Sequence, residues 1–119
     1  MKIRNKEELE ALGITVEGLD VYRNGKLLKE QIRSKTSKNS GHTCSYIGYM
    51  IGAYKKQKWV NKSNIIYCWY IGDRDTNKDI DHINNNSLDD RPENLQLLTR
   101  QENLAKRESF KIYNQYTTI

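Results

Sequence analysis

Three residues in the C-terminal half of the chain have side chains that suit phosphodiester chemistry. Asp81 and His82 are adjacent, and Asn103 follows further along. Carboxylate and amide oxygens are ligands that a hard divalent metal ion favours, with phosphate and water completing its shell. A histidine, whose pKa is ordinarily about 6.5, can take a proton from a water molecule that attacks phosphorus. The three side chains would form a metal-assisted hydrolytic site if the fold brought them together.

The residues around this trio predict two strands, a polar turn and a helix. Thr99 and Glu102 have the Thr-x-x-Glu spacing of a capping box, which marks the start of a helix. The two flanking segments alternate apolar and polar side chains, as half-buried strands do. In chain order we expect a strand at residues 80–83, a polar turn region at 84–92, a strand at 94–98 and a helix that continues to Arg107.

This element order has a geometric consequence for the trio. Neighbouring residues of a strand point to opposite faces, so the side chains of Asp81 and His82 should separate. If the helix packs across the two strands, Asn103 on its first turns can meet Asp81 at one cation.

The segment resembles the HNH endonuclease family, in the branch whose third motif residue is asparagine. The resemblance rests on Asp-His-Ile at residues 81–83, on Asn-Leu at residues 94–95, and on Asn103. The run RPENLQLLTRQEN at residues 91–103 is typical of that branch. The phage-borne and intron-encoded homing endonucleases are the members that the segment resembles most.

The resemblance implies a ββα-metal fold and a role for each motif residue. Asp81 and Asn103 would ligate one divalent metal ion, with Mg²⁺ or Mn²⁺ expected. His82 would be the general base, and Asn94 would tie the loop to the strand and hold the surroundings of the histidine. The ion would stabilise the leaving 3′ oxygen, so that the products carry 5′-phosphate and 3′-hydroxyl ends.

Three further acids, Asp79, Asp89 and Asp90, lie close enough in the sequence to be mistaken for metal ligands. We expect them to be solvated loop acids. Acids concentrated beside a phosphate-binding surface nevertheless favour a divalent metal in this half of the chain.

The charge of +5 is distributed unevenly along the chain. Residues 21–62 hold ten basic residues and one acid, a local charge of +9, whereas residues 71–102 hold eight acids and four bases, a local charge of −4. A basic surface indicates a polyanion, most often nucleic acid, although a lysine-rich solvated surface gives the same pattern. The residues that we expect to contact double-stranded DNA are Arg91, Arg100, Lys106, Arg107, Lys55, Lys56 and Lys58.

The rest of the chain predicts a small α+β domain, in which a C-terminal ββα-metal motif follows an N-terminal β-hairpin and strand region. Asn24-Gly25 favours a type I′ turn, because both central residues need positive φ. The expected elements are a helix at 6–12, a hairpin at 19–28, a loop at 35–43, a strand at 45–53, and either a helix or a buried strand within 59–70. We divide the chain into a basic, β-rich support at residues 1–70, which also contacts DNA, and the nuclease motif with a short tail at residues 71–119.

Several classes of protein are disfavoured. Cys44 and Cys68 form no Cys-x-x-Cys pair and there are no paired histidines, so we expect two reduced thiols and no structural zinc. The longest apolar run, residues 65–72, is far shorter than the ~18 residues of a membrane span. The N-terminus becomes charged before a signal-peptide core could form, which predicts a cytoplasmic protein without a membrane partner.

The leading hypothesis is a metal-dependent DNA endonuclease with one active site per chain. A monomer would nick one strand, and two coordinated cuts would need a homodimer or two successive events. The alternative is a catalytically weak DNA-binding accessory protein on the same fold. An RNA-binding module has less support, because the sequence has no aromatic-rich stacking signature.

Overall fold

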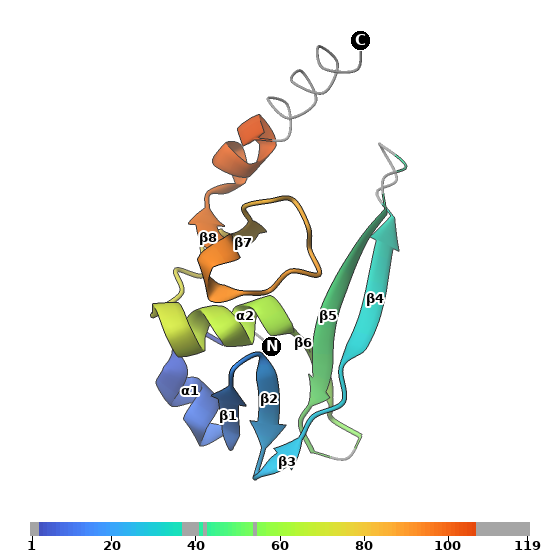
Figure 1. Ribbon diagram of the computed structural model, residues 1–119, viewed down its shortest axis with the longest axis vertical. Helices are drawn as coiled ribbons and strands as arrows, with labels where there is room; N and C mark the ends of the chain where they lie inside the picture. Colours follow the sequence, from blue (N-terminus) through green and yellow to red (C-terminus); the bar gives the residue numbers. More distant parts are fainter. Residues whose placement is uncertain (1–2, 37–40, 42, 54, 107–119) are drawn as a thin grey trace.

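The computed structural model describes residues 3–36, 41, 43–53 and 55–106. Within them, the strands form three small antiparallel sheets around a helix that lies near the middle of the molecule (Figure 1). The predicted α+β class is therefore confirmed.

The first layer contains α1 (Lys6–Ala11) and the sheet β1 (Ile14–Glu17), β2 (Asp20–Arg23) and β3 (Lys26–Leu27). Asn24 and Gly25 join β2 to β3 with φ values of 52° and 80°, which is the positive-φ pair that a type I′ turn requires. The predicted helix and hairpin are both confirmed.

A second sheet is built from β4 (Gln31–Thr36), β5 (Thr43–Ile51) and β6 (Lys58–Asn61). The prediction of a loop at residues 35–43 was wrong at both ends, because Lys35 and Thr36 pair with Cys44 and Thr43. Every residue of β4 is exposed, so this strand lacks the apolar alternation that would have identified it. Residues 37–40 and 42 of the predicted loop lie outside the described residues.

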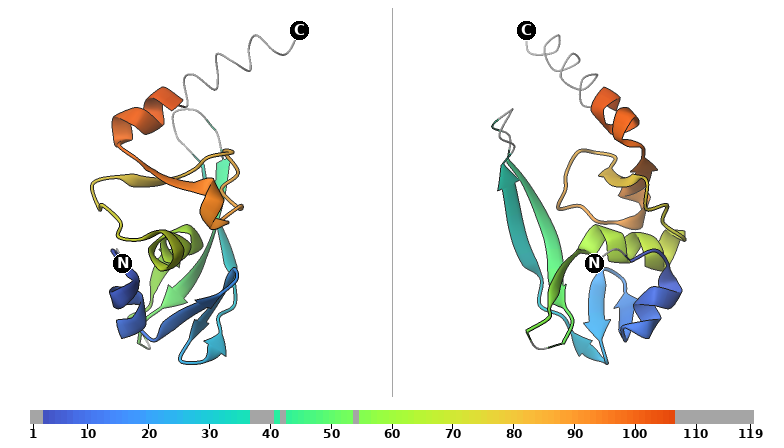
Figure 2. Two further views of the ribbon diagram at one scale, coloured as in Figure 1. Left: turned by 60° about the vertical axis from the view of Figure 1, so that its left-hand side comes forward. Right: turned by 180° about the vertical axis from the view of Figure 1, so that it is seen from behind.

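The segment whose secondary structure the sequence left open is largely helical. After β6, α2 (Lys62–Ile66) continues directly into one turn of π-helix, η1 (Tyr67–Ile71). This helix lies between the N-terminal layer and the C-terminal strands in each view (Figures 1 and 2). Among the described helices, none is long and apolar enough to cross a membrane.

The C-terminal motif consists of β7 (Asp79–His82), the 3₁₀ turn η2 (Pro92–Asn94), β8 (Leu95–Leu98) and a helix described over residues 100–106. The capping box is formed: Thr99 Oγ1 accepts from the Glu102 amide at 3.1 Å, and Glu102 Oε1 accepts from the Thr99 amide at 3.1 Å. Strand, turn, strand and helix therefore follow one another as predicted.

Buried apolar side chains of the described residues form one cluster, and the C-terminal motif packs against this cluster. Eight of its twelve members precede residue 61. Leu95 of β8 belongs to the same cluster, and Ile80 of β7 packs against it. The motif thus depends on a core that earlier parts of the chain largely supply.

Candidate active site

Two paired strands set the directions of the predicted catalytic side chains. In the antiparallel pair of β7 and β8, Asp81 lies opposite Gln96 and His82 lies opposite Leu95. As the alternation of a strand requires, the two neighbours contact different groups: Asp81 meets β8 and the C-terminal helix, whereas His82 meets the loop between the strands.

The His82 ring is held by a buried carboxylate. His82 is 7% exposed, and its Nε2 lies 2.6 Å from Oδ1 of Asp90, which is 4% exposed. In the tautomer of neutral His82 that carries its hydrogen on Nε2, this nitrogen donates to the Asp90 carboxylate. That tautomer leaves the lone pair on Nδ1, which has no hydrogen-bond partner among the described residues.

The burial of Asp90 overturns the expectation that it is a solvated loop acid. Its second oxygen, Oδ2, is buried and has no partner in the described part of the chain. A buried carboxylate that is only half satisfied is costly to keep, and the short contact with His82 is its one side-chain hydrogen bond among the described residues. Asp79, by contrast, is exposed as predicted.

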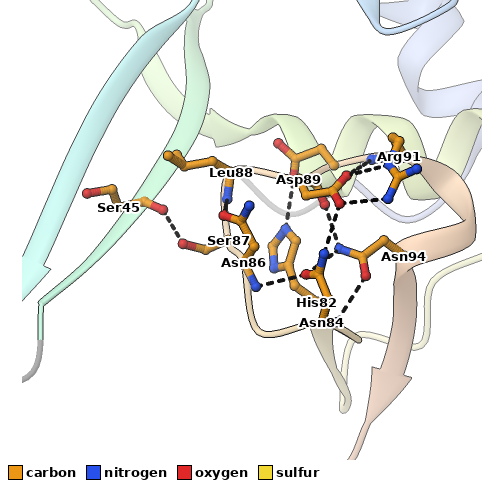
Figure 3. Close-up of polar contacts among 10 residues, drawn as sticks. Ser45, His82, Asn84, Asn86, Ser87, Leu88, Asp89, Arg91 and Asn94 are labelled. Carbon is orange, nitrogen blue, oxygen red and sulfur yellow. Dashed lines mark hydrogen bonds and ion pairs between the residues drawn. The ribbon is translucent and has the colours of Figure 1, made fainter.

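Asn94 fastens the loop that encloses His82 (Figure 3). Its Oδ1 accepts from the Asn84 amide at 3.0 Å, and its Nδ2 donates to Asn84 Oδ1 at 3.0 Å and to the Asp89 carbonyl at 2.8 Å. Its own carbonyl accepts from the Ile83 amide at 2.8 Å. These contacts tie the end of β7 to the start of β8, which places Asn94 in a structural position beside the histidine.

A second interaction closes the same loop at its surface. Arg91 donates from Nε to Asp89 Oδ1 at 2.8 Å and from its guanidinium to Oδ2 at 2.9 Å. These hydrogen bonds lower the pKa of Asp89 to about 2 and raise that of Arg91. Arg91, which we expected at a phosphate, is thus paired within the chain, although its side chain remains 54% exposed.

Asp81 faces a cation contributed by the chain itself. Its Oδ2 accepts from Gln96 Nε2 at 2.8 Å and from Lys106 Nζ at 2.5 Å. Lys106 Nζ also donates to the carbonyl of His82 at 3.0 Å and to that of Ile83 at 3.2 Å. Three oxygen atoms therefore converge on one positive charge.

No hydrogen bond joins the predicted metal ligands Asp81 and Asn103 in the described part of the chain, and Asn103 lines the cleft beside His82 whereas Asp81 does not. Asp81 bonds to Lys106, and Asn103 lies one helical turn before Lys106, on the same face of the helix. No group of three or more His, Cys, Asp and Glu side chains in the described residues is arranged to hold a metal ion. The oxygen set at Asp81 fits a hard divalent ion, which would use one carboxylate together with the carbonyl oxygens of His82 and Ile83.

A cleft of about 670 Å³ opens beside His82. Asn103 and Arg100 line it from the C-terminal helix, and Lys35 lines it from β4. Arg74, which follows the central helix, completes a set of three basic residues in the lining. Its Nε is buried and has no partner among the described residues, so its guanidinium has unused hydrogen-bonding capacity.

Lys35 and Arg74 were missed by sequence reasoning. Lys35 lies in a stretch that we expected to be a loop, and Arg74 lies in the acidic part of the chain, between Asp73 and Asp75. Of the basic residues that were predicted, Arg100 lines the cleft and Lys106 turns inward to Asp81. Arg107 lies outside the described residues.

The remaining predicted DNA contacts, Lys55, Lys56 and Lys58, are exposed, and none of them lines the cleft. They belong to the connection from β5 to β6 and to the start of β6. That connection lies at the end of β5 away from β7 and β8 (Figure 1). Any contact they make with DNA would therefore be outside the cleft.

Comparison with known proteins identifies the C-terminal motif. The family model of the HNH endonucleases matches residues 61–105, a span that contains α2, η1, both strands of the motif and most of its described helix. No curated protein and no solved structure matches the chain. Residues 61–105 therefore match the HNH endonuclease family.

Proposed function

We propose that the protein is a metal-dependent endonuclease that hydrolyses phosphodiester bonds of double-stranded DNA, of the phage or homing type. The observation that carries the proposal is the cleft beside His82, which joins a histidine to three basic side chains. A phosphodiester needs both a base to activate water and positive charge around the phosphate.

His82 acts as the general base in this proposal. Asp90 holds the ring through Nε2, so Nδ1 is the nitrogen that accepts the proton of the attacking water. Asp90 is a positioning residue that fixes the tautomer and orientation of the imidazole. Asn94 contributes by holding the loop on which Asp90 lies.

Asp81 and Asn103 would hold the divalent ion, Mg²⁺ or Mn²⁺. When bound, the ion supplies charge that stabilises the leaving 3′ oxygen. The protein's own contribution is to keep Asp81 on the face of β7 opposite His82, so that base and ligand act from separate directions.

Lys35, Arg74 and Arg100 would bind the DNA backbone at the scissile phosphate. The proposed division of labour assigns residues 1–70 to support and DNA contact, and residues 71–119 to catalysis. The exposed residues Lys55, Lys56 and Lys58 would extend the contact along the backbone. Binding through phosphates predicts an affinity that falls steeply as salt rises.

The test is cleavage of supercoiled plasmid in Mg²⁺ or Mn²⁺, beside an EDTA sample. We expect relaxed circles or linear product only with metal, and a loss of about 10²–10⁴-fold in rate for His82→Ala. His42→Ala, a change at the other histidine, is the matched control and should cleave as the native protein does.

Relaxed circles alone would indicate nicking, and linear product at low turnover would indicate coordinated cuts by a dimer. Absence of cleavage with either metal, while DNA is still bound, would refute the endonuclease proposal. It would instead favour the alternative of a DNA-binding accessory protein on this fold.

A further inference from the structure

The Lys106 ammonium is the most completely bonded charge near the candidate active site. An ammonium has three hydrogen atoms to donate, and Nζ has three acceptors: Oδ2 of Asp81 and the carbonyls of His82 and Ile83. The Lys106 side chain is only 24% exposed and that of Asp81 only 11%. The chain's own oxygens have therefore largely replaced water around this cation.

These acceptors come from three consecutive residues, with Asp81 and His82 at the end of β7 and Ile83 directly after it, and two of the three acceptors are backbone carbonyls. One carboxylate and two carbonyl oxygens are the donor types that Mg²⁺ or Mn²⁺ would use. A lysine ammonium and a divalent ion both seek this set, and their like charges exclude simultaneous occupancy.

We propose that Lys106 is a built-in competitor for the divalent ion: its ammonium fills the oxygen site in the metal-free protein and leaves when the ion binds. The inference rests on the proposed function, since it concerns the ion that Asp81 would hold there. Its consequence is that metal affinity is set by an internal exchange of cations, and not by the oxygen ligands alone.

The exchange of the lysine for the metal ion requires no movement of the C-terminal helix. Lys106 follows Asn103 by one turn, so competitor and second proposed ligand share one face of the helix. The lysine stem is long and flexible, and it can rotate its charge away while the helix stays in place. Asn103 is short and stays at the cleft, where an amide oxygen remains available.

The test is a titration of Mn²⁺ into the full chain without DNA, in which electron paramagnetic resonance measures the concentration of the free ion. Lys106→Met keeps most of the side-chain length and removes the charge. A charge-assisted hydrogen bond is worth about tenfold or more in an equilibrium constant, so we expect Mn²⁺ to bind Lys106→Met at least about tenfold more tightly than the native chain. Lys106→Gln should move in the same direction, which guards against misfolding of the first variant, and circular dichroism checks both.

Lys78→Met is the matched control for charge. The hydrogen bonds with Thr99 are the main cause of the lowered pKa of Glu102, and the positive charge of Lys78 lowers that pKa further. Lys78 therefore lies near the same helix, and it makes no hydrogen bond to Asp81 among the described residues. Its Mn²⁺ affinity should stay within about twofold of native, because long-range charge near the surface is screened.

Asp81→Asn separates this proposal from the proposed function. If the native chain and both Lys106 variants bind Mn²⁺ equally and Asp81→Asn abolishes binding, the metal site stands and the competition by Lys106 is refuted. Equal gains for Lys106→Met and Lys78→Met would also refute it, since the effect would be general electrostatics. If neither the native chain nor Lys106→Met binds Mn²⁺, both proposals fail.

Discussion

Removing the Asn94 side chain should loosen the loop that encloses His82. Asn94→Ala deletes three hydrogen bonds, two to Asn84 and one to the Asp89 carbonyl, from a residue that is 6% exposed. Each is worth about 0.5–1.5 kcal/mol net. Asn84 is exposed and can bond to water instead, which favours the lower half of that range. We therefore expect the free energy of unfolding to fall by about 2 kcal/mol.

The assay is urea denaturation followed by tryptophan fluorescence, with the midpoint and slope fitted together. Asn77→Ala is the control, because its side chain is exposed and it should change the free energy of unfolding by less than about 0.5 kcal/mol. A loss below about 0.5 kcal/mol for Asn94→Ala, equal to that of the control, would refute the view that this amide fastens the loop.

Two further predictions concern ionisation. Burial raises the pKa of the Cys68 thiol to about 11, and the residue is 1% exposed. At pH 8 we therefore expect Ellman's reagent to react quickly with Cys44 alone in the native protein, and with both thiols only in denaturant. Two rapidly reacting thiols in the native protein would contradict this. The bonds from Arg91 hold the pKa of Asp89 at about 2, so their stabilisation is present above the ordinary carboxyl pKa of about 3.9 and is lost as pH falls through about 2. Arg91→Ala should move the Asp89 pKa toward about 3.9 in a carbon-13 NMR titration, and an unchanged value would count against the pairing.

The features that sequence analysis predicted correctly are those set by local chemistry. Asn24-Gly25 forms its turn and Thr99 with Glu102 forms its capping box, because the groups that bond are a few residues apart. The alternation of apolar and polar residues, together with the capping box, also predicted the strand, turn, strand and helix of the motif.

What sequence could not reveal depends on distant parts of the chain. Asp89 and Asp90 are identical neighbours, yet one pairs with Arg91 near the surface and the other is buried against His82, and only the path of the loop decides between them. Lys35 reaches the cleft because β4, the exposed strand on which it lies, pairs with β5. The sequence of β4 has no apolar alternation from which this strand could have been predicted.

The shared core has a consequence for how this nuclease motif can be inherited or transplanted. The segment that identifies the family is residues 61–105, but most of the buried cluster beneath it comes from before residue 61. A two-stranded sheet without such support is at best marginally stable in water. The motif can therefore be recognised as a short cassette, but a graft into another scaffold must carry the upstream layers or supply an apolar surface of matching shape. Substitutions in those upstream layers would therefore weaken the motif by destabilising the core beneath it, even if every motif residue stayed unchanged.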